Sequence, residues 1–408
     1  MAQIFPFRAI LYRPASGNDI GTLVAPPYDV IDADQRQIYH DRSDYNIVRL
    51  VLPEGDSDGK YESAARQFDQ WLDAGVLSED GQEAFYVWEQ QFEHDGRTYH
   101  RRALVAKVAC GPYQAGGVMP HELTHAGPKA DRLKLFQATG AQFSQLFGIF
   151  DDPSQEAQRL ILAACDSEPL RVAVADDGHV SRLYRMGDTS SADRLQQILA
   201  DLTVVMADGH HRYETAVAYF EGQGQAGAAL MTLVPSDDAG LLVKPTHRVT
   251  PLPLGPDEIS GALDEAFNVE RHPLASWPGL HSQQLDTSSD ALLAVSPHHG
   301  AALHMTTANG RDNTADIFGA VGRLHHDCLP LLAARAPEVD LDKFDYHHDA
   351  AQAVQSAGEV GGWAFLLPPT LAPQLLKVAR EKAVLPPKST YFHPKFMSGF
   401  ISSRLTAI

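Results

Sequence analysis

Two apolar and aromatic runs predict a β-hairpin in the first third of the chain. Apolar and aromatic runs at residues 85–93 and 98–108 are joined by His94-Asp95-Gly96-Arg97. An Asp-Gly pair suits a turn that needs positive φ, so the two runs are expected to form antiparallel strands.

A strand, a turn and a helix are predicted near the middle of the chain. Residues 202–206 form a short apolar run, which is followed by a polar turn. After the turn, apolar side chains recur at helical spacing, at Tyr213, Ala216, Val217 and Phe220.

The remaining pattern predicts more elements of both kinds. Strands are expected at 228–234, 241–249 and 362–367, and helices at 316–328 and 371–383. The fold class predicted from this mixture is α+β.

Chain length predicts more than one domain, because 408 residues exceed the size at which one hydrophobic core usually stops growing. We expect an N-terminal α/β region with the hairpin at 1–110, a core with the strand-turn-helix at 111–252, and a C-terminal α/β domain at 253–408.

Charge, hydropathy and cysteine content indicate which partners and which location to expect. The formal net charge is −19, and no basic patch offsets it, so nucleic acid is not expected as a partner. The sequence has no apolar run long enough to span a membrane, and its start does not resemble a signal peptide. Three widely spaced cysteines fit a reducing compartment, so a cytoplasmic location is expected.

The turn after residue 206 concentrates side chains that suit a phosphate. It reads Asp208-Gly209-His210-His211-Arg212. Glycine permits a tight turn, and the helix that follows presents unpaired N–H groups to an anion. Arginine grips phosphate with two donors, histidine donates or moves a proton, and aspartate holds a metal ion such as Mg²⁺ or acts as a base. The alternative is that Asp208 only caps a helix whose first turn is solvated.

Several motifs in order resemble domain-of-unknown-function family number 1015 over nearly the whole chain. The resemblance rests on Ala207-Asp208-Gly209-His210-His211-Arg212-Tyr213-Glu214-Thr215-Ala216, on residues 25–31 and 46–50, on His121-Glu122 with Lys129, Asp131 and Arg132, and on residues 245–248 and 386–392.

The Asp-Gly-His-His-Arg segment also looks like that of free-serine kinases of the ParB and sulfiredoxin fold. This local resemblance implies a ParB/sulfiredoxin-like core within 111–252 and a kinase that uses ATP or ADP on a small hydroxyl compound such as serine. It places Asp208, His210 and His211 near the transferred group, and by order along the chain it makes Glu122 the candidate base.

A second motif competes with this interpretation. His121-Glu122-Leu123-Thr124-His125 matches the H-E-x-x-H pattern of zinc hydrolases. Pro120 before it and Gly127-Pro128 after it leave little helix to hold both imidazoles. The family pattern instead suggests phosphate contacts from Lys129 and Arg132, with His121 near the substrate.

Further polar residues are candidates for binding the nucleotide or substrate. His247 and Arg248 follow a predicted strand, and either cover a nucleotide or form an ordinary strand edge. Lys388, Ser389, Thr390 and Lys395 lie in a proline-stiffened segment that suits a phosphoester or packs as a C-terminal strap. Asp29 and Arg49 either belong to the site or make a turn and a surface ion pair.

Three functions are consistent with these residues. The leading hypothesis is a phosphotransferase acting between a nucleotide and a small hydroxyl metabolite. The same groups also suit a phosphatase of phosphoserine or a similar monoester, and a nucleotide-switched binding protein without catalysis remains a third possibility.

Overall fold

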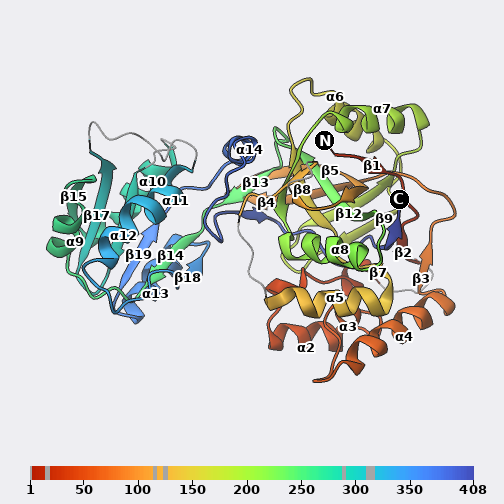
Figure 1. Ribbon diagram of the computed structural model, residues 1–408, viewed down its shortest axis with the longest axis horizontal. Helices are drawn as coiled ribbons and strands as arrows, with labels where there is room; N and C mark the ends of the chain where they lie inside the picture. The colour runs from red at the N-terminus through yellow and green to blue at the C-terminus, as the bar shows by residue number, and fades with distance from the viewer. Residues whose placement is uncertain (1, 14–18, 114–116, 123–126, 287–290, 309–317) are drawn as a thin grey trace. The chain divides into compact units, whose positions relative to one another are not determined.

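The computed structural model describes residues 2–13, 19–113, 117–122, 127–286, 291–308 and 318–408. The chain forms two compact units. Unit 1 comprises Met1–Pro120, Thr124–Leu242 and Pro394–Ile408, and unit 2 comprises His121–Leu123 and Val243–His393. Both ends of the chain therefore belong to unit 1 (Figure 1).

The described part of unit 1 is built on a ten-stranded mixed sheet. Its strands follow the order β6-β11-β8-β12-β5-β4-β10-β9, with β1 on β5 and β22 on β12. The β12–β8 and β11–β6 pairs are parallel, and the other pairs are antiparallel. The bounds are β1 Ile4–Phe5, β4 Tyr86–His94, β5 Arg97–Cys110, β6 Val118–Met119, β8 Leu146–Phe150, β9 Arg171–Val174, β10 Val180–Arg185, β11 Val204–Asp208, β12 Gly227–Pro235 and β22 Thr406–Ala407.

Two short pairs, β2 with β3 and β7 with β21, and a set of helices complete unit 1. The strands are β2 Ile10–Tyr12, β3 Leu77–Glu79, β7 Ala141–Gln142 and β21 Ser403–Arg404. The helices are α1 Ile20–Leu23, η2 Tyr28–Val30, α2 Ala33–Arg42, α3 Val48–Val51, α4 Gly59–Asp73, α5 Gly127–Thr139, α6 Glu156–Ala164, α7 Thr189–Ala200 and α8 His210–Gly222.

The predicted hairpin is confirmed by β4 and β5. Their register runs from Tyr86 opposite Val105 to His94 opposite Arg97. Asp95 and Gly96 have φ angles of 48° and 71°, which is the left-handed conformation that the Asp-Gly turn requires.

The two faces of the sheet bury different partners, because successive side chains of a strand point in opposite directions. Val87 of β4 belongs to the main core, together with apolar residues of α6, α7 and α8. Its neighbour Trp88 points the other way and packs on Phe396 and Phe400, at ring-centroid distances of 5.0 and 4.5 Å. The part of the C-terminal segment that contains Phe396 and Phe400 therefore packs on the face opposite the main core.

The predicted strand, turn and helix are also confirmed. Strand β11 ends at Asp208, Gly209 occupies the turn with φ of 89°, and α8 begins at His210. Tyr213, Ala216 and Phe220 of α8 are buried, as the helical spacing predicts.

The described part of unit 2 contains a six-stranded antiparallel sheet in the order β15-β17-β16-β19-β14-β18, and β13 pairs with β20. The strands are β13 Leu242–Lys244, β14 His247–Thr250, β15 Phe267–Pro273, β16 Leu292–Ser296, β17 Ala301–Thr307, β18 Asp345–His347, β19 Trp363–Leu366 and β20 Tyr391–His393. The helices are α9 Pro256–Leu263, η4 Leu274–Ser276, α10 Trp277–Asp286, α11 Gly319–Gly322, the π-helix η6 Arg323–Cys328, α12 Leu329–Ala333, α13 Ala350–Glu359 and α14 Ala372–Arg380.

One predicted strand is wrong in detail. Residues 241–249 form two strands, β13 and β14, which are interrupted at Pro245 and Thr246. Proline has no N–H to donate to a sheet, which accounts for a break there. The strand expected at 362–367 and the helix expected at 371–383 correspond to β19 and α14.

The predicted α+β class holds as a mixed α/β fold with several sheets. The finer division at 1–110, 111–252 and 253–408 stays a prediction. Within the described residues, no helix is sufficiently long and apolar to cross a membrane.

Candidate functional site

The carboxylate of Asp208, just before α8 begins, pairs with two positively charged side chains. The Nζ atom of Lys395 lies 2.6 Å from its Oδ1, and Nη2 of Arg212 lies 2.8 Å from its Oδ2. Each carboxylate oxygen thus accepts from a different charged donor, which makes both hydrogen bonds stronger than neutral ones. We call Asp208, Arg212 and Lys395 the Asp208 cluster.

Arg212 is held in a fixed position. Its side chain is only 6% exposed, and its Nη1 donates to the backbone carbonyl of Gln145 at 2.5 Å. A Cβ atom at Gly209 would lie 3.1 Å from the guanidinium carbon. The turn therefore requires glycine for its positive φ and also for the close approach of Arg212.

The charge state of Asp208 follows from these contacts. Burial alone would raise the pKa of the Asp208 carboxyl, but Lys395 and Arg212 lower that pKa by more, and His210 lowers it further. The result is a pKa well below the ordinary aspartate value. Asp208 is therefore a permanent anion at neutral pH and a poor proton acceptor.

Tyr28 and Asp29 of the preceding turn interact electrostatically with Arg212. Burial raises the pKa of Tyr28, and both Arg212 and Arg132 act on its hydroxyl to lower that pKa. The guanidinium of Arg132 lies 4.3 Å from the centre of the Tyr28 ring. Asp29 acts electrostatically on Arg212 and raises its pKa, against the effect of burial. The turn at residues 28–29 thus contributes to the surroundings of the cluster.

Arg132 is itself anchored by backbone and carboxylate. It is 5% exposed, and its Nη1 donates to the carbonyl of Val51 at 2.5 Å. Its Nε donates to Asp131 at 2.8 Å. Burial raises the pKa of Asp131, but hydrogen bonds from Tyr61 and Arg132 bring that pKa down to about 2.

Three more predicted site residues lie in the first turn of α8 and near the start of α5. His210 is buried and His211 is half-buried, both in the first turn of α8. Lys129 near the start of α5 forms an ion pair with Glu214 of α8. Lys129 therefore joins α5 to the helix that begins at the cluster.

Arg101, a buried arginine, fixes the backbone next to Lys395. It was not among the site residues predicted from the sequence. Arg101 of β5 has no exposed surface and donates to the carbonyl of Pro394 and, at 3.1 Å, to Oε1 of Gln90. Gln90 in turn donates to the carbonyl of Lys395 at 3.3 Å. Arg101 stands among other polar residues, Thr98, His100 and Arg102, so no sequence signal distinguished it.

A second group of predicted residues lies in unit 2. Nε2 of His121 lies 2.9 Å from Oγ1 of Thr390, and Glu122 accepts the N–H of Lys388 at 3.1 Å. The side chain of Lys388 is exposed, and its φ is 58°. Ser389 is buried and donates to the carbonyl of Pro386 at 2.5 Å.

Arg248 and His247 are buried side by side on β14. Arg248 lies 2.9 Å from Nε2 of His325 and donates to the carbonyls of Thr246 at 2.8 Å and Pro387 at 3.2 Å. Burial lowers the pKa of Arg248 to about 10, although Tyr346 and Glu122 raise it. His247 accepts the N–H of Leu367 at 3.2 Å.

Arg49 makes local contacts only, as far as the described residues show. It donates to the carbonyls of His40 at 2.9 Å and Ser43 at 3.2 Å, and it pairs with Asp44 at 3.3 Å. These contacts fit the alternative of a surface ion pair better than a role in binding.

Comparison with known proteins identifies the family. The family model described as "Protein of unknown function (DUF1015)" matches residues 4–322. The chain belongs to the DUF1015 family. No curated protein sequence is significantly similar to it.

Similar solved structures of low identity also exist. A mutant free serine kinase in complex with ADP is 11% identical, with a TM-score of 0.37 over 68% of this chain and 84% of that chain. A free serine kinase in complex with AMP is 11% identical, with a TM-score of 0.36 over 68% and 83%. A conserved hypothetical protein from Pyrococcus furiosus is 12% identical, with a TM-score of 0.35 over 72% and 91%. Likenesses at these TM-scores decide neither fold nor activity.

The predicted site residues of this DUF1015 protein thus fall into two sets. Unit 1 contains Asp29, Arg49, Lys129, Arg132, Asp208, Gly209, His210, His211, Arg212 and Lys395, and unit 2 contains His121, Glu122, His247, Arg248, Lys388, Ser389 and Thr390. The segment expected to act as one loop, residues 387–395, contributes to both sets. The roles of these residues stay predictions.

The zinc-hydrolase pattern falls largely outside the described residues. Leu123, Thr124 and His125 are among those not described, so its second histidine has no described position. Among the residues that are described, no group of three or more histidine, cysteine, aspartate or glutamate side chains is arranged to hold a metal ion.

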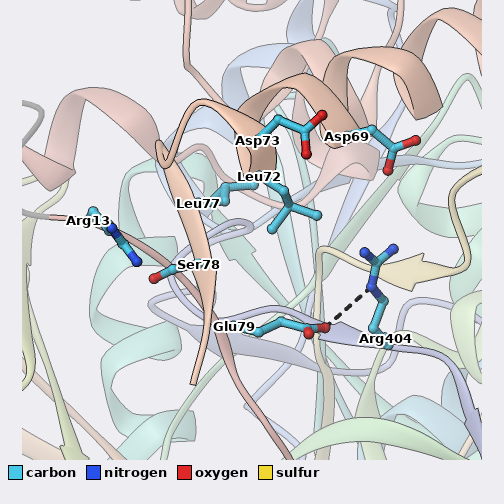
Figure 2. A pocket seen from close by; sticks show the side chains of 8 residues that line it. All are labelled: Arg13, Asp69, Leu72, Asp73, Leu77, Ser78, Glu79 and Arg404. Atoms are coloured by element: carbon cyan, nitrogen blue, oxygen red, sulfur yellow. Dashed lines mark hydrogen bonds and ion pairs between the residues drawn. The ribbon is translucent and has the colours of Figure 1, made fainter. Parts of the chain in front are cut away.

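Another hollow in the DUF1015 chain has a lining of its own. Figure 2 shows it at the end of α4, where Asp69 and Asp73 face the ion pair between Arg404 and Glu79, 3.3 Å apart. It contains none of the predicted site residues.

A methyl group at Gly209 should disturb the turn directly. Gly209→Ala places a Cβ against Arg212 and forces a non-glycine residue to φ near 89°. We expect a loss of about 1–3 kcal/mol in the free energy of unfolding, measured by urea denaturation. The matched control is Gly224→Ala in the same unit, which also has positive φ but no atom within 4 Å of the added Cβ. Equal losses in the two variants would show that close packing on Arg212 adds nothing.

Unit 2 should lose stability on mild acidification. Burial, with neighbouring His281 and His348, lowers the pKa of His247 to about 3, below its ordinary value near 6.5. The unfolded chain therefore takes up a proton below pH 6.5 that the folded chain does not, and stability falls by about 1.4 kcal/mol per pH unit between these values.

We expect His247→Gln to reduce this dependence, measured as the urea midpoint between pH 7 and pH 4; His325, whose pKa burial also lowers to about 3, retains its share. The control His272→Gln changes a histidine whose side chain is 31% exposed and should leave the slope as in the wild type. The same slope in wild type and His247→Gln would contradict the assignment.

Proposed function

We propose that this protein is a phosphotransferase that moves a phosphoryl group between a nucleotide, ATP or ADP, and a small hydroxyl metabolite. Free serine is the first acceptor to test. The strand-turn-helix around Asp208 belongs, in this proposal, to a ParB/sulfiredoxin-like core. The observation that supports it most is the placement of Lys395 and Arg212 on one carboxylate at the N-terminus of α8.

This arrangement suits a phosphate for three physical reasons. The start of a helix offers N–H groups and a partial positive charge to an anion. Lys395 and Arg212 have Asp208 as their shared charged partner, so a phosphate oxygen can share their donors without either charge being left unpaired. Gly209 allows the backbone of the turn to approach closely.

Charge balance supports a divalent cation in the reaction. Lys395 and Arg212 pair with Asp208, Lys129 pairs with Glu214, and Arg132 pairs with Asp131. Because these cations already have carboxylate partners, a bound polyphosphate adds negative charge that the described side chains do not neutralise. Mg²⁺ is the ion that usually fills this role for nucleotides, so we propose an Mg²⁺–nucleotide complex as the substrate.

The proton of the acceptor hydroxyl needs another base than Asp208, whose pKa is strongly lowered. His210 and His211 lie next to it in unit 1, and histidine is the side chain best suited to proton transfer at neutral pH. Glu122 is the base that the resemblance to free-serine kinases implies. Separate His211→Gln and Glu122→Gln variants assign the base to the residue whose loss removes the acidic limb of the pH–rate profile, where a general base becomes protonated.

The test is a direct assay for phosphorylated acceptor. The protein is incubated with Mg²⁺ and ATP or ADP, with and without serine or one of a set of small hydroxyl compounds, and the products are identified by mass spectrometry. Acceptor-dependent formation of a phosphomonoester supports the proposal. Phosphate release from phosphoserine without nucleotide would instead indicate a phosphatase, and nucleotide binding without any turnover would indicate a nucleotide-switched binding protein.

A further inference from the structure

Lys107 is a buried lysine outside the proposed phosphate site. It lies on β5 of unit 1 and is 4% exposed. Its Nζ donates to the carbonyl of Arg404 and to the hydroxyl of Thr406, the latter at 2.5 Å. Among the described residues it has no carboxylate in ion-pair contact, so its hydrogen-bond partners are neutral.

Lys107 lines a cavity of about 460 Å³. Phe5, Phe7 and Ile408 are among its other lining residues, together with the charged residues Arg8, Glu79, Glu83 and Arg404. Glu83 lines the same cavity and acts electrostatically on Lys107. Its volume falls within the range of pockets that take small molecules.

Burial without a carboxylate partner changes the chemistry of the amine. Burial lowers the pKa of Lys107 to about 8, although Cys110 and Glu83 act in the opposite direction. At pH 7 roughly one Lys107 side chain in ten is then the neutral amine, whereas fewer than one in a thousand ordinary lysines are. A neutral amine is a nucleophile, and the ammonium form is not.

We propose that Lys107 is a reactive amine and that its cavity takes small, largely apolar aldehydes or ketones, which Lys107 binds covalently as imines. The Lys107 nitrogen attacks the carbonyl carbon and forms the C–N bond, while the carbonyl electron pair moves to oxygen. That oxygen takes a proton, and the nitrogen releases one, which gives a carbinolamine. Glu83, in its protonated form, gives a proton to the carbinolamine hydroxyl, which leaves as water, and takes back the remaining N–H proton, so that the neutral imine with its C=N bond is formed.

This site is independent of the phosphotransferase proposal, because none of the residues proposed to bind phosphate lines the cavity. The apolar members of the lining, Phe5, Phe7 and Ile408, suit an apolar ligand body. Arg404 and Glu79 line this cavity and also the hollow of Figure 2, but of these two Lys107 lines only the cavity.

The test is reductive trapping with benzaldehyde and cyanoborohydride on the full-length folded protein, followed by peptide mass mapping. At pH 7.5 we expect Lys107 to acquire the benzyl group about tenfold or more faster than Lys134, whose side chain is 47% exposed. In urea this preference should disappear, because both amines are then equally solvated. Half-maximal labelling of Lys107 should occur near pH 8.

Two variants test separately whether the label requires the amine of Lys107 and whether it requires the cavity. Lys107→Arg preserves the charge and should remove the fast label without changing that of Lys134. Ala407→Phe keeps the amine but adds bulk to a residue that lines the cavity, and it should slow labelling of Lys107 alone. Labelling of folded Lys107 no faster than Lys134, or undiminished fast labelling in a folded Ala407→Phe protein, would overturn the proposal.

Discussion

Replacing Lys395 by methionine should lower kcat/KM for the nucleotide by about two to three powers of ten, because it removes a charged donor from the proposed phosphate site. The fold should persist, since Asp208 keeps its hydrogen bond from Arg212 at 2.8 Å and the Lys395 backbone stays held by Gln90. The measurement is the steady-state rate of phosphomonoester formation, with circular dichroism to confirm folding.

The matched control for this variant is Lys134→Met. Lys134 also pairs with an aspartate, Asp58, at 2.7 Å, but both side chains are largely exposed. We expect its kcat/KM to equal that of the wild type. A folded Lys395→Met protein with wild-type kcat/KM would exclude the Asp208 cluster from catalysis.

Replacing Asp208 by asparagine should have the largest effect on stability. The substitution leaves Arg212 and Lys395, whose side chains are 6% and 17% exposed, without their shared carboxylate. Loss of one partner from a buried ion pair costs about 3–5 kcal/mol, so we expect a drop of about 3 kcal/mol in the free energy of unfolding. Urea denaturation at pH 7 measures it.

The pH dependence of the stability difference between wild type and Asp208→Asn tests whether the ionised carboxylate of Asp208 is its cause. The folded pKa of Asp208 lies below its unfolded value near 3.8, so its stabilisation is fully present above that value and declines as the pH falls below it. The difference between wild type and Asp208→Asn should therefore be constant from pH 7 to pH 5 and shrink below pH 4. Asp58→Asn, at an exposed pair, should change stability by less than about 1 kcal/mol. A difference of that size for Asp208→Asn as well would show that the cluster is not a buried ion pair.

The elements that the sequence predicted are those with strong local signals. Asp95-Gly96 determines the hairpin turn by backbone preference alone, and the spacing of apolar residues after Gly209 is that of a helix. The apolar pattern was misleading at residues 241–249, because Pro245 has no N–H to donate and interrupts the run, whose two parts form strands in two different sheets.

Only part of the candidate site could be predicted from the sequence, and the reason is physical. A turn of five consecutive residues, 208–212, shows its chemistry in the sequence, but the partners of that turn come from distant segments. Lys395 is separated from Asp208 by 187 positions, and Arg212 donates to a backbone carbonyl, that of Gln145, which no side-chain pattern marks. Residues 388–390 are part of the same sequence segment as Lys395, but they belong to unit 2, whereas Lys395 belongs to unit 1.

The most direct test of the central claim is the change in melting temperature that Mg²⁺–ADP causes in the wild type and in Lys395→Met. A ligand that binds only the folded protein stabilises it, by about 2.7 kcal/mol at one hundred times its Kd. If the Asp208 cluster binds phosphate, the melting temperature of the wild type should rise by several degrees with saturating Mg²⁺–ADP, and that of the folded Lys395→Met protein should rise little or not at all. No rise in the wild type, or an equal rise in both proteins, would contradict the account.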